Sequence, residues 1–522
     1  MLNRRELLIG SASAWAAAAL PTLPTLLNLP LPAAGGRLLR PRFSAYPFSL
    51  GVASGDPRPD GVVLWTRLAP DPLRGGGMPG EPAEVEWVIA ADEAMGRVVQ
   101  RGREVAAPQL AHSVHVEVEG LQPERWYWYQ FRAGGELSPV GRTRTTAAAG
   151  AANRRLRFGF CSCNHYEQGY YTAYRHMAEE ELELVFHLGD YIYEYEGRED
   201  RVRMHTYREI DTIDDYRNRY ALYKADPDFQ AVHAAAPFVV TWDDHEVDNN
   251  YAGSISENDD PVEAFLRRRA NAYQAYYEHM PLRRASMPRG DGMQLYRGLG
   301  YGQLAGFWVL DTRQYRTDQP CDDTSGPRCP AVFDEAATLM GAEQESWLFN
   351  GLDRSAARWN IVPQQIMVAP VNQRPADSDG RYSMDQWSGY DAARNRLVDF
   401  LGGRRPSNPV VLTGDIHSNW VNDLKADFAD PSSATVGTEL VVTSISSGGD
   451  GSDTNARTAE ILAANPFVSF YNGQRGYVVC ELSEEALRAD YRVVEYVSQP
   501  DAPITTRASF LIEDDRPGAQ RL

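Results

Sequence analysis

From about residue 154 onward, short apolar runs alternate with segments of helical periodicity, and this alternation constrains the fold more than any other feature. The apolar runs predict strands at 156–160, 184–188, 238–242, 306–310, 359–362, 410–413 and 439–445. Apolar residues three or four positions apart predict helices at 170–181, 215–223, 261–279, 342–352 and 391–401. Strands that alternate with helices favour a layered α/β domain, which we expect over residues 154–515.

The preceding part of the chain has a different pattern, with short alternating runs separated by Gly and Pro. Strands are predicted at 62–66, 83–89, 113–118 and 126–131. Their number and spacing favour a small all-β sandwich of fibronectin or immunoglobulin type over residues 43–145. At the other end, residues 502–522 have little periodicity, and we expect a mobile C-terminal segment.

The first residues have the composition of an export signal. Arg4-Arg5 is followed by Leu7-Leu8 and by an Ala-rich stretch that ends near Leu20 and is too short for a spanning helix. This pattern favours a twin-arginine signal over an ordinary Sec signal. We therefore expect a signal and spacer over residues 1–35, the twin-arginine export machinery as a partner, a secreted or periplasmic location, and no stable membrane span.

The net charge and the cysteines restrict the partners and the disulfides that this chain can have. A net charge of −19 argues against a nucleic-acid partner, because binding to the phosphate backbone requires a basic surface. Export permits disulfides, and the polar loop between Cys321 and Cys329 predicts a bridge between them. Cys161 and Cys163 are only two residues apart and are poorly placed to bridge each other.

Metal-ligating residue types follow four of the predicted strands directly. These segments are Cys161-Ser-Cys-Asn-His165, Gly189-Asp-Tyr-Ile-Tyr193, Asp243-Asp-His-Glu-Val-Asp-Asn-Asn250 and Gly414-Asp-Ile-His417. A single Gly-Asp pair after a strand is common in turns and is weak evidence. Because ligands of open α/β sheets bind at the carboxyl ends of the strands, the four segments together predict one metal site.

The order of these segments resembles the metallophosphoesterase superfamily pattern, which runs Asp-x-His, Gly-Asp, Gly-Asn-His-Asp/Glu, Gly-His and Gly-His-x-His. More narrowly, the chain is similar to the PhoD-type alkaline phosphatase/phosphodiesterase family. The matching stretches are 158–163, 185–195, 241–251, 277–283, 309–315 and 412–417, with 51–57 and 63–67 matching the family's N-terminal domain. The resemblance spans residues 43–515 and implies a layered αββα catalytic domain after the β-sandwich.

Four residues form an expected iron-like site: Cys163, Asp190, Tyr193 and His417. The two oxygens of Asp190 can bridge two cations, and a phenolate beside a carboxylate suits Fe(III). Cys163 occupies the position where the superfamily has its first Asp, and its alternative role is a buried structural thiol.

A second site would share Asp190 and add Asp244 and Asp415. Here the chain departs from the superfamily, because Asp244 and Asp415 replace an Asn and a His. Oxygen ligands favour Ca²⁺, Mg²⁺ or Mn²⁺ over zinc, and the resemblance points to Fe³⁺ with Ca²⁺. Asp243, Asn249 and Asn250 are further candidate oxygen ligands.

By the superfamily motif, His245 contacts the phosphoryl group or protonates the leaving oxygen, and Glu246 holds its tautomer; Asn164 is a second catalytic candidate. We interpret Arg283, Arg313 and Arg316 as surface salt bridges rather than anion contacts. The remaining histidines receive structural interpretations: His165, His176, His187, His205 and His233.

The sequence therefore supports a secreted, metal-dependent phosphoesterase that hydrolyses phosphate mono- and diesters with a hydroxide generated on the metal. Two alternatives from other classes stay open. One is an iron enzyme of another class, which needs a two-His-one-carboxylate triad. The other is a non-catalytic, calcium-dependent binding module.

Overall fold

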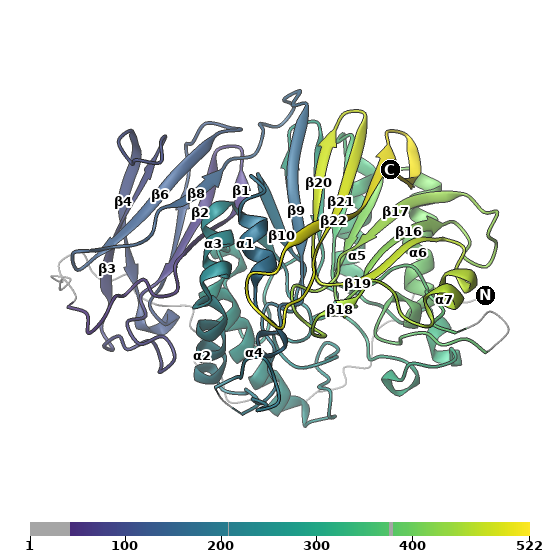
Figure 1. Cartoon of the computed structure of the whole chain (residues 1–522), viewed down its shortest axis with the longest axis horizontal. Helices are drawn as coiled ribbons and strands as arrows, with labels where there is room; N and C mark the ends of the chain where they lie inside the picture. The colour runs from purple at the N-terminus through teal and green to yellow at the C-terminus, as the bar shows by residue number, and fades with distance from the viewer. Residues whose placement is uncertain (1–41, 207, 375–378) are drawn as a thin grey trace, which may run out of the picture. The chain divides into compact units, whose positions relative to one another are not determined.

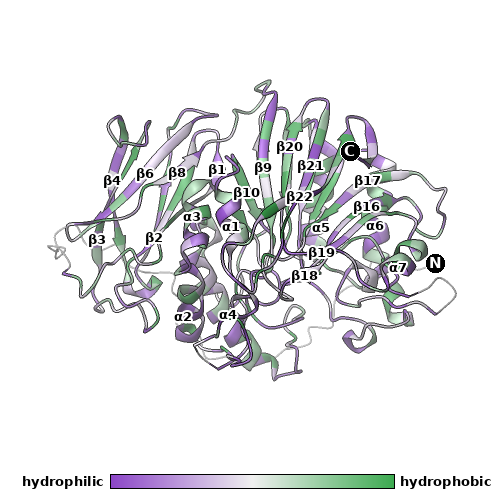
Figure 2. Ribbon diagram, in the orientation of Figure 1, coloured by the Kyte–Doolittle hydropathy of each residue, from purple (hydrophilic) through white to green (hydrophobic). Residues whose placement is uncertain are grey.

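The computed structural model describes residues 42–206, 208–374 and 379–522, and these form a mixed α/β fold with two large sheets (Figure 1). The first sheet has ten strands in the order β23-β22-β21-β20-β9-β10-β11-β1-β2-β5. The second has eight, in the order β12-β13-β14-β15-β17-β16-β19-β18. Figure 2 shows hydrophobic stretches along strands such as β20 and β21.

The central strands of the two sheets are parallel and coincide with the apolar runs of the sequence. In the first sheet these are β9 (Arg155–Cys161), β10 (Leu184–His187) and β11 (Phe238–Val240). In the second they are β13 (Ala305–Val309), β14 (Trp359–Pro363), β15 (Pro409–Thr413) and β17 (Thr435–Val441). The α/β class expected from the alternation is confirmed.

Three buried clusters show which faces pack together. Side chains of both sheets share one cluster, in which Phe158 of β9 and Phe186 of β10 contact Phe307 of β13 edge to face or at a tilt. A second cluster joins the first sheet to four helices: α1 (Thr172–Ala178), α2 (Ile213–Lys224), α3 (Pro227–Ala235) and α4 (Val262–His279). The third joins the second sheet to α5 (Gly341–Arg354) and α6 (Asp391–Arg404).

Two helices were not predicted: α3 and α7 (Thr458–Ala464). Both are short, and α3 had a readable start signal, because Asp226 caps it and Pro227 is its first residue.

The strands of the N-terminal region divide between two sheets. Strands β1 (Val52–Arg58), β2 (Gly61–Arg67) and β5 (Ser113–Val118) belong to the ten-stranded sheet, which β1 joins by parallel pairing with β11. A separate five-stranded sheet contains β3 (Ala83–Ala90), β4 (Val98–Ala106), β6 (Trp126–Ala133), β7 (Glu136–Leu137) and β8 (Gly141–Arg144). Both groups of strands share one buried cluster. The sequence did not predict that one face of this region continues a larger sheet.

The expectation of a mobile C-terminal segment is wrong. Strands β22 (Ile504–Glu513) and β23 (Arg516–Arg521) form a hairpin at the edge of the first sheet, beside β21 (Ala486–Val494). Ala508, Phe510 and Ile512 alternate into the core shared by the two sheets. This alternation is a strand signal, and it was missed because charged residues and a Pro-Gly pair follow it.

The remaining strands lie in these sheets: β12 (Arg297–Tyr301), β16 (Asn419–Lys425), β18 (Gly451–Ser452), β19 (Val468–Gln474) and β20 (Gly476–Ser483). The predicted bridge is confirmed, since Cys321 and Cys329 form a disulfide, whereas Cys161, Cys163 and Cys480 are buried free thiols. The predicted export signal at 1–35 lies outside the described residues. Among the residues described, no helix is long and apolar enough to cross a membrane.

Candidate metal centre

The chain turns sharply after the central strands, and four candidate ligands occupy these turns in the left-handed conformation. The φ angles are +59° at Cys163, +54° at Asp190, +64° at Asp415 and +54° at His417. Residues other than glycine rarely adopt such φ angles, because each one costs roughly 1–3 kcal/mol. Residues with this backbone conformation cluster at functional sites. Backbone bonds hold the first two turns together, because Cys163 donates to the carbonyl of Gly189 at 3.0 Å.

The structure brings Cys163, Asp190 and His417 together, with one ligand atom from each within 4.8 Å of the others. The Tyr193 hydroxyl joins this group, donating to Asp190 Oδ2 at 2.8 Å and lying 3.2 Å from His417 Nε2. His417 also faces solvent, with 34% of its side chain exposed, whereas Asp190 is buried. The group therefore has one accessible side.

The donor set of this group fits a transition metal. It combines a thiol, an imidazole, a phenol and a carboxylate, and Asp190 Oδ1 is buried without a hydrogen-bond partner among the described residues. Burial, followed by the charges of Asp190 and Asp415, raises the pKa of Cys163 well above its usual value. Burial, Asp190 and Cys163 do the same to the pKa of Tyr193. Both groups would ionise only beside a cation.

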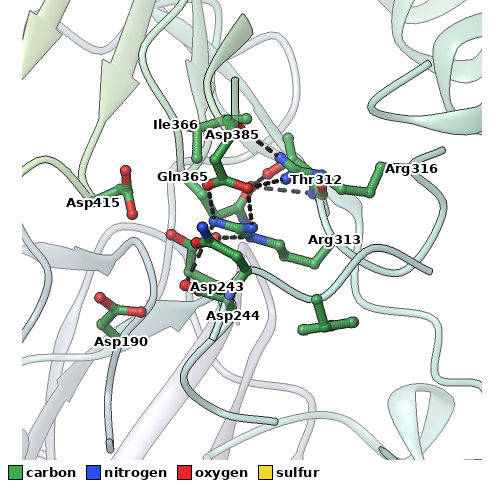
Figure 3. A network of polar contacts seen from close by, with 12 residues as sticks. Asp190, Asp243, Asp244, Thr312, Arg313, Arg316, Gln365, Ile366, Asp385 and Asp415 are labelled. Atoms are coloured by element: carbon green, nitrogen blue, oxygen red, sulfur yellow. Dashed lines mark hydrogen bonds and ion pairs between the residues drawn. The ribbon is translucent and has the colours of Figure 1, made fainter. Parts of the chain in front are cut away.

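A second group consists of carboxylates. Asp243, Asp244 and Asp415 place one oxygen each within 4.8 Å of one another, and Asp190 forms a similar group with Asp244 and His245. Figure 3 shows Asp190 and Asp415 on one side of this region and Asp243 and Asp244 on the other. Asp243 Oδ2 and Asp244 Oδ1 are buried without a hydrogen-bond partner in the described part of the chain. A set of carboxylate oxygens whose lone pairs are not used by hydrogen bonds fits a hard cation.

Of the further oxygen candidates, Asp243 belongs to this group, while the amide nitrogens of the two asparagines bond other carboxylates. The Asn249 amide donates to Glu257 at 2.6 Å, and the Asn250 amide donates to Asp323 at 2.5 Å. Asn250 contributes its backbone N–H instead, which donates to Asp244 Oδ2 at 2.8 Å. Both asparagine side chains are thus engaged with other residues.

His245 is oriented by a different glutamate from the one expected. Its Nδ1 lies 2.8 Å from Glu194 Oε2, whereas Glu246 accepts hydrogen bonds from the backbone of Asp190, Tyr191 and Asp243. Glu246 therefore ties two of the turns together, and the expectation that it holds the His245 tautomer is wrong. Burial alone would lower the pKa of His245, but Glu194, Asp244 and Asp190 raise it well above its usual value.

The rings next to this histidine form a stack. Tyr193 lies between His165 and His245, with ring centroids 4.2 Å and 4.1 Å away. This packing fixes the plane of the Tyr193 ring. His165, for which the sequence indicates a structural role, thus packs against a candidate ligand and helps to position it.

The side chain of Asn164 does not join either group. Its Oδ1 accepts from the Tyr174 hydroxyl at 3.0 Å and lies 2.7 Å from His187 Nε2, while its Nδ2 donates to the Tyr191 carbonyl at 2.9 Å. Asn164 is fully buried, and its three side-chain hydrogen bonds all go to residues outside the carboxylate group. We therefore expect it to support the turns rather than contact a substrate.

The arginines expected at the surface are buried, and that interpretation is wrong. Arg313 is fully buried against Asp243 and Asp385, and Arg316 pairs with Asp385 at 2.6 Å. Arg283 is also buried and contacts Glu117 at 3.1 Å. Asp385 could not be identified as the partner of Arg313 and Arg316 from the sequence, because it lies in an irregular segment 72 residues from Arg313.

Comparison with known proteins gives consistent results for the whole chain. The family model described as PhoD-like phosphatase matches residues 158–491, and the model for the N-terminal domain of PhoD-like phosphatases matches residues 33–147. Alkaline phosphatase D of Bacillus subtilis (strain 168) is 54% identical over 487 residues, which cover 92% of this chain and 83% of that protein. A solved structure of PhoD, also 54% identical, superposes with a TM-score of 0.91 and covers 92% of this chain and 93% of its own.

Proposed function

Because this chain belongs to the PhoD-like phosphatase family, it is a phosphoric ester hydrolase, and we propose that it works with bound Fe³⁺ and Ca²⁺ on phosphate mono- and diesters. Membership of this family argues against the binding-module and other-iron-enzyme alternatives. The observation that carries the proposal is the convergence of Cys163, Asp190, Tyr193 and His417 on one point beside a second, carboxylate-only group.

We assign the Fe³⁺ to Cys163, Asp190, Tyr193 and His417, since thiolate, phenolate and carboxylate together match a trivalent charge. Ca²⁺ is assigned to Asp244 and Asp415, with Asp190 shared and Asp243 as an additional ligand, because all of these donors are oxygens. When bound, such cations neutralise phosphate charge and activate water. Asp190 would contribute to both sites, since its carboxylate lies within 4.8 Å of ligand atoms of Cys163 and His417 on one side and of Asp244 on the other.

His245 is the proposed proton donor to the leaving oxygen. Glu194 accepts the hydrogen bond from Nδ1, which leaves Nε2 for the substrate. The Tyr193 ring packs against the imidazole and restricts its rotation.

The proposal extends to organisation and location. We assign residues 43–145 to the N-terminal domain and residues from 154 onward to a metallophosphoesterase-like catalytic domain with αββα layering, which the three buried clusters support. Residues 1–35 are proposed to direct export by the twin-arginine route to the periplasm or the medium. Replacing Arg4 and Arg5 by Lys should block export, so that the phosphatase activity is found inside the cell. Unchanged export would refute this route.

The test of the metal assignment combines metal analysis with hydrolysis. We expect about one iron per chain, a violet or brown colour from thiolate and phenolate charge transfer, and hydrolysis of bis(p-nitrophenyl) phosphate and p-nitrophenyl phosphate that calcium increases. His417→Ala and Asp190→Ala should lose iron, colour and activity together. His176→Ala is the matched control, because His176 bonds the Ala502 carbonyl at 2.9 Å, away from both groups. A colourless zinc enzyme with full activity would overturn the assignment.

A further inference from the structure

The buried guanidinium of Arg313 lies between two sets of carboxylates (Figure 3). On one side its Nε is 2.5 Å from Asp243 Oδ1, and its Nη2 is 3.5 Å from Asp244 Oδ1. On the other side Nη1 and Nη2 each bond one oxygen of Asp385 at 2.7 Å, in a bidentate pair. Arg313 is completely buried, so solvent screens none of these contacts.

Asp385 binds the guanidinium on the side that faces away from Asp243 and Asp244, and so shares its positive charge with them. It also accepts from Arg316 Nη1 at 2.6 Å and from the Gln319 amide at 2.8 Å, so it is itself fixed. The free oxygens, Oδ2 of Asp243 and Oδ1 of Asp244, have no hydrogen-bond partner among the described residues. Arg313 thus bonds Asp243 Oδ1 and lies 3.5 Å from Asp244 Oδ1, but makes no hydrogen bond to either of the two oxygens that a cation would take.

Asp243 and Asp244 are buried and Asp415 is half-buried, and three carboxylates this close repel one another strongly unless a positive charge is near. Asp243 and Asp244 form ion pairs with Arg313, and Asp415 bonds the Gln386 amide. Within the described ranges, no other arginine or lysine forms an ion pair with any of the three. Arg313 is therefore the arginine whose charge directly opposes this repulsion, while His245 lies within 4.8 Å of Asp244 on the side of Asp190.

We propose that Arg313 is a positioning residue that acts as an internal counter-cation: it stabilises the metal-free carboxylate group, and Asp385 limits how strongly it competes with the incoming divalent cation. This inference rests on the proposed calcium site at Asp243, Asp244 and Asp415. Arg313 and Asp385 form one ion pair, yet removing the charge of each should change calcium binding in opposite directions. Removing Arg313 leaves the repulsion to be relieved by calcium alone, whereas neutralising Asp385 releases the full guanidinium charge onto the site.

The test uses the full-length protein after chelation and measures the melting temperature and the calcium dissociation constant as CaCl₂ is added. For Arg313→Gln we expect a lower melting temperature without calcium, a larger rise when calcium is added, and a dissociation constant lower by about fivefold to tenfold. For Asp385→Asn we expect a smaller rise and weaker binding by a similar factor. Arg313→Lys, which keeps the charge, should return the calcium response towards that of the parent.

Arg297→Gln is the matched control, because Arg297 pairs with Asp56 at 2.7 Å and contacts neither metal group. It should lower the melting temperature equally with and without calcium. If Arg313→Gln behaves like this control, or if Asp385→Asn changes the calcium response in the same direction as Arg313→Gln, the proposal is wrong. If calcium has no effect on the parent protein, the calcium site itself is absent, and the proposal is lost with it.

Discussion

Lys224 gives a quantitative test of how burial controls the stability of this fold. It is the last residue of α2, is 2% exposed, and places its ammonium 4.2 Å from the Trp65 ring centroid and 5.4 Å from that of Tyr191. Among the described residues, no carboxylate forms an ion pair with it. Burial lowers the pKa of Lys224 from 10.5 to about 7.

The sign of the pH dependence follows from this shift. Below about pH 7 both the folded and unfolded states carry the proton, and the cost of burying the charge is constant. Between about pH 7 and pH 10.5 the unfolded state binds more protons, so stability rises with pH. At about 1.4 kcal/mol per pH unit, the lysine costs roughly 4 kcal/mol near pH 7 and less than about 1 kcal/mol near pH 10.

Lys224→Met removes this cost while keeping an unbranched side chain. We expect the variant to gain up to about 4 kcal/mol in free energy of unfolding near pH 7, reduced by about 1 kcal/mol for the lost cation–π contacts. The gain should vanish towards pH 10. Urea denaturation of parent and variant across this pH range measures the difference, and Lys425→Met, at the chain's other lysine, is the control. A difference that is constant with pH, or that grows as pH rises, would refute the reasoning.

Three further changes test other parts of the structure. Glu194→Gln should lower kcat at least about tenfold while leaving iron and calcium content unchanged, as elemental analysis can check; loss of metal would instead make Glu194 part of the metal support. Gly189→Ala should prevent folding or lose metal, because Gly189 has φ +111° and an added Cβ would clash with Asp243; normal metal content and normal circular dichroism would contradict this. Phe510→Ala should cost about 3–5 kcal/mol in urea denaturation, because its ring is fully buried between the sheets, and a loss below about 1 kcal/mol would mean that the C-terminal hairpin is dispensable.

The ligand turns were predictable because their signal is local. An apolar run predicts a strand, and the polar residue that ends it is placed at the edge of a parallel sheet. The sequence could therefore predict that Cys163, Asp190 and His417, from three distant segments, lie close together. The disulfide was predictable for the same reason, since Cys321 and Cys329 are close in the sequence.

The supporting residues could not be predicted, because their partners are set by tertiary packing alone. Glu246 was expected to be the partner of His245 because it is adjacent in the sequence, whereas the path of the chain after β10 brings Glu194 to the imidazole instead. Arg313 reads as a surface residue until its pairing with Asp385 is known. Sheet membership is also non-local, as the pairing of β1 with β11 illustrates.

The order of strands in the ten-stranded sheet has a consequence for how the protein matures. β9, which leads into Cys163, pairs on one side with β10 and on the other with β20, whose residues leave the ribosome more than three hundred positions later. Until then β9 presents an open edge, the kind of surface on which nascent chains aggregate. Synthesis must therefore be almost finished before both neighbours of β9 are in place, so we expect the candidate ligands at the end of β9 to gather only after most of the chain has left the ribosome.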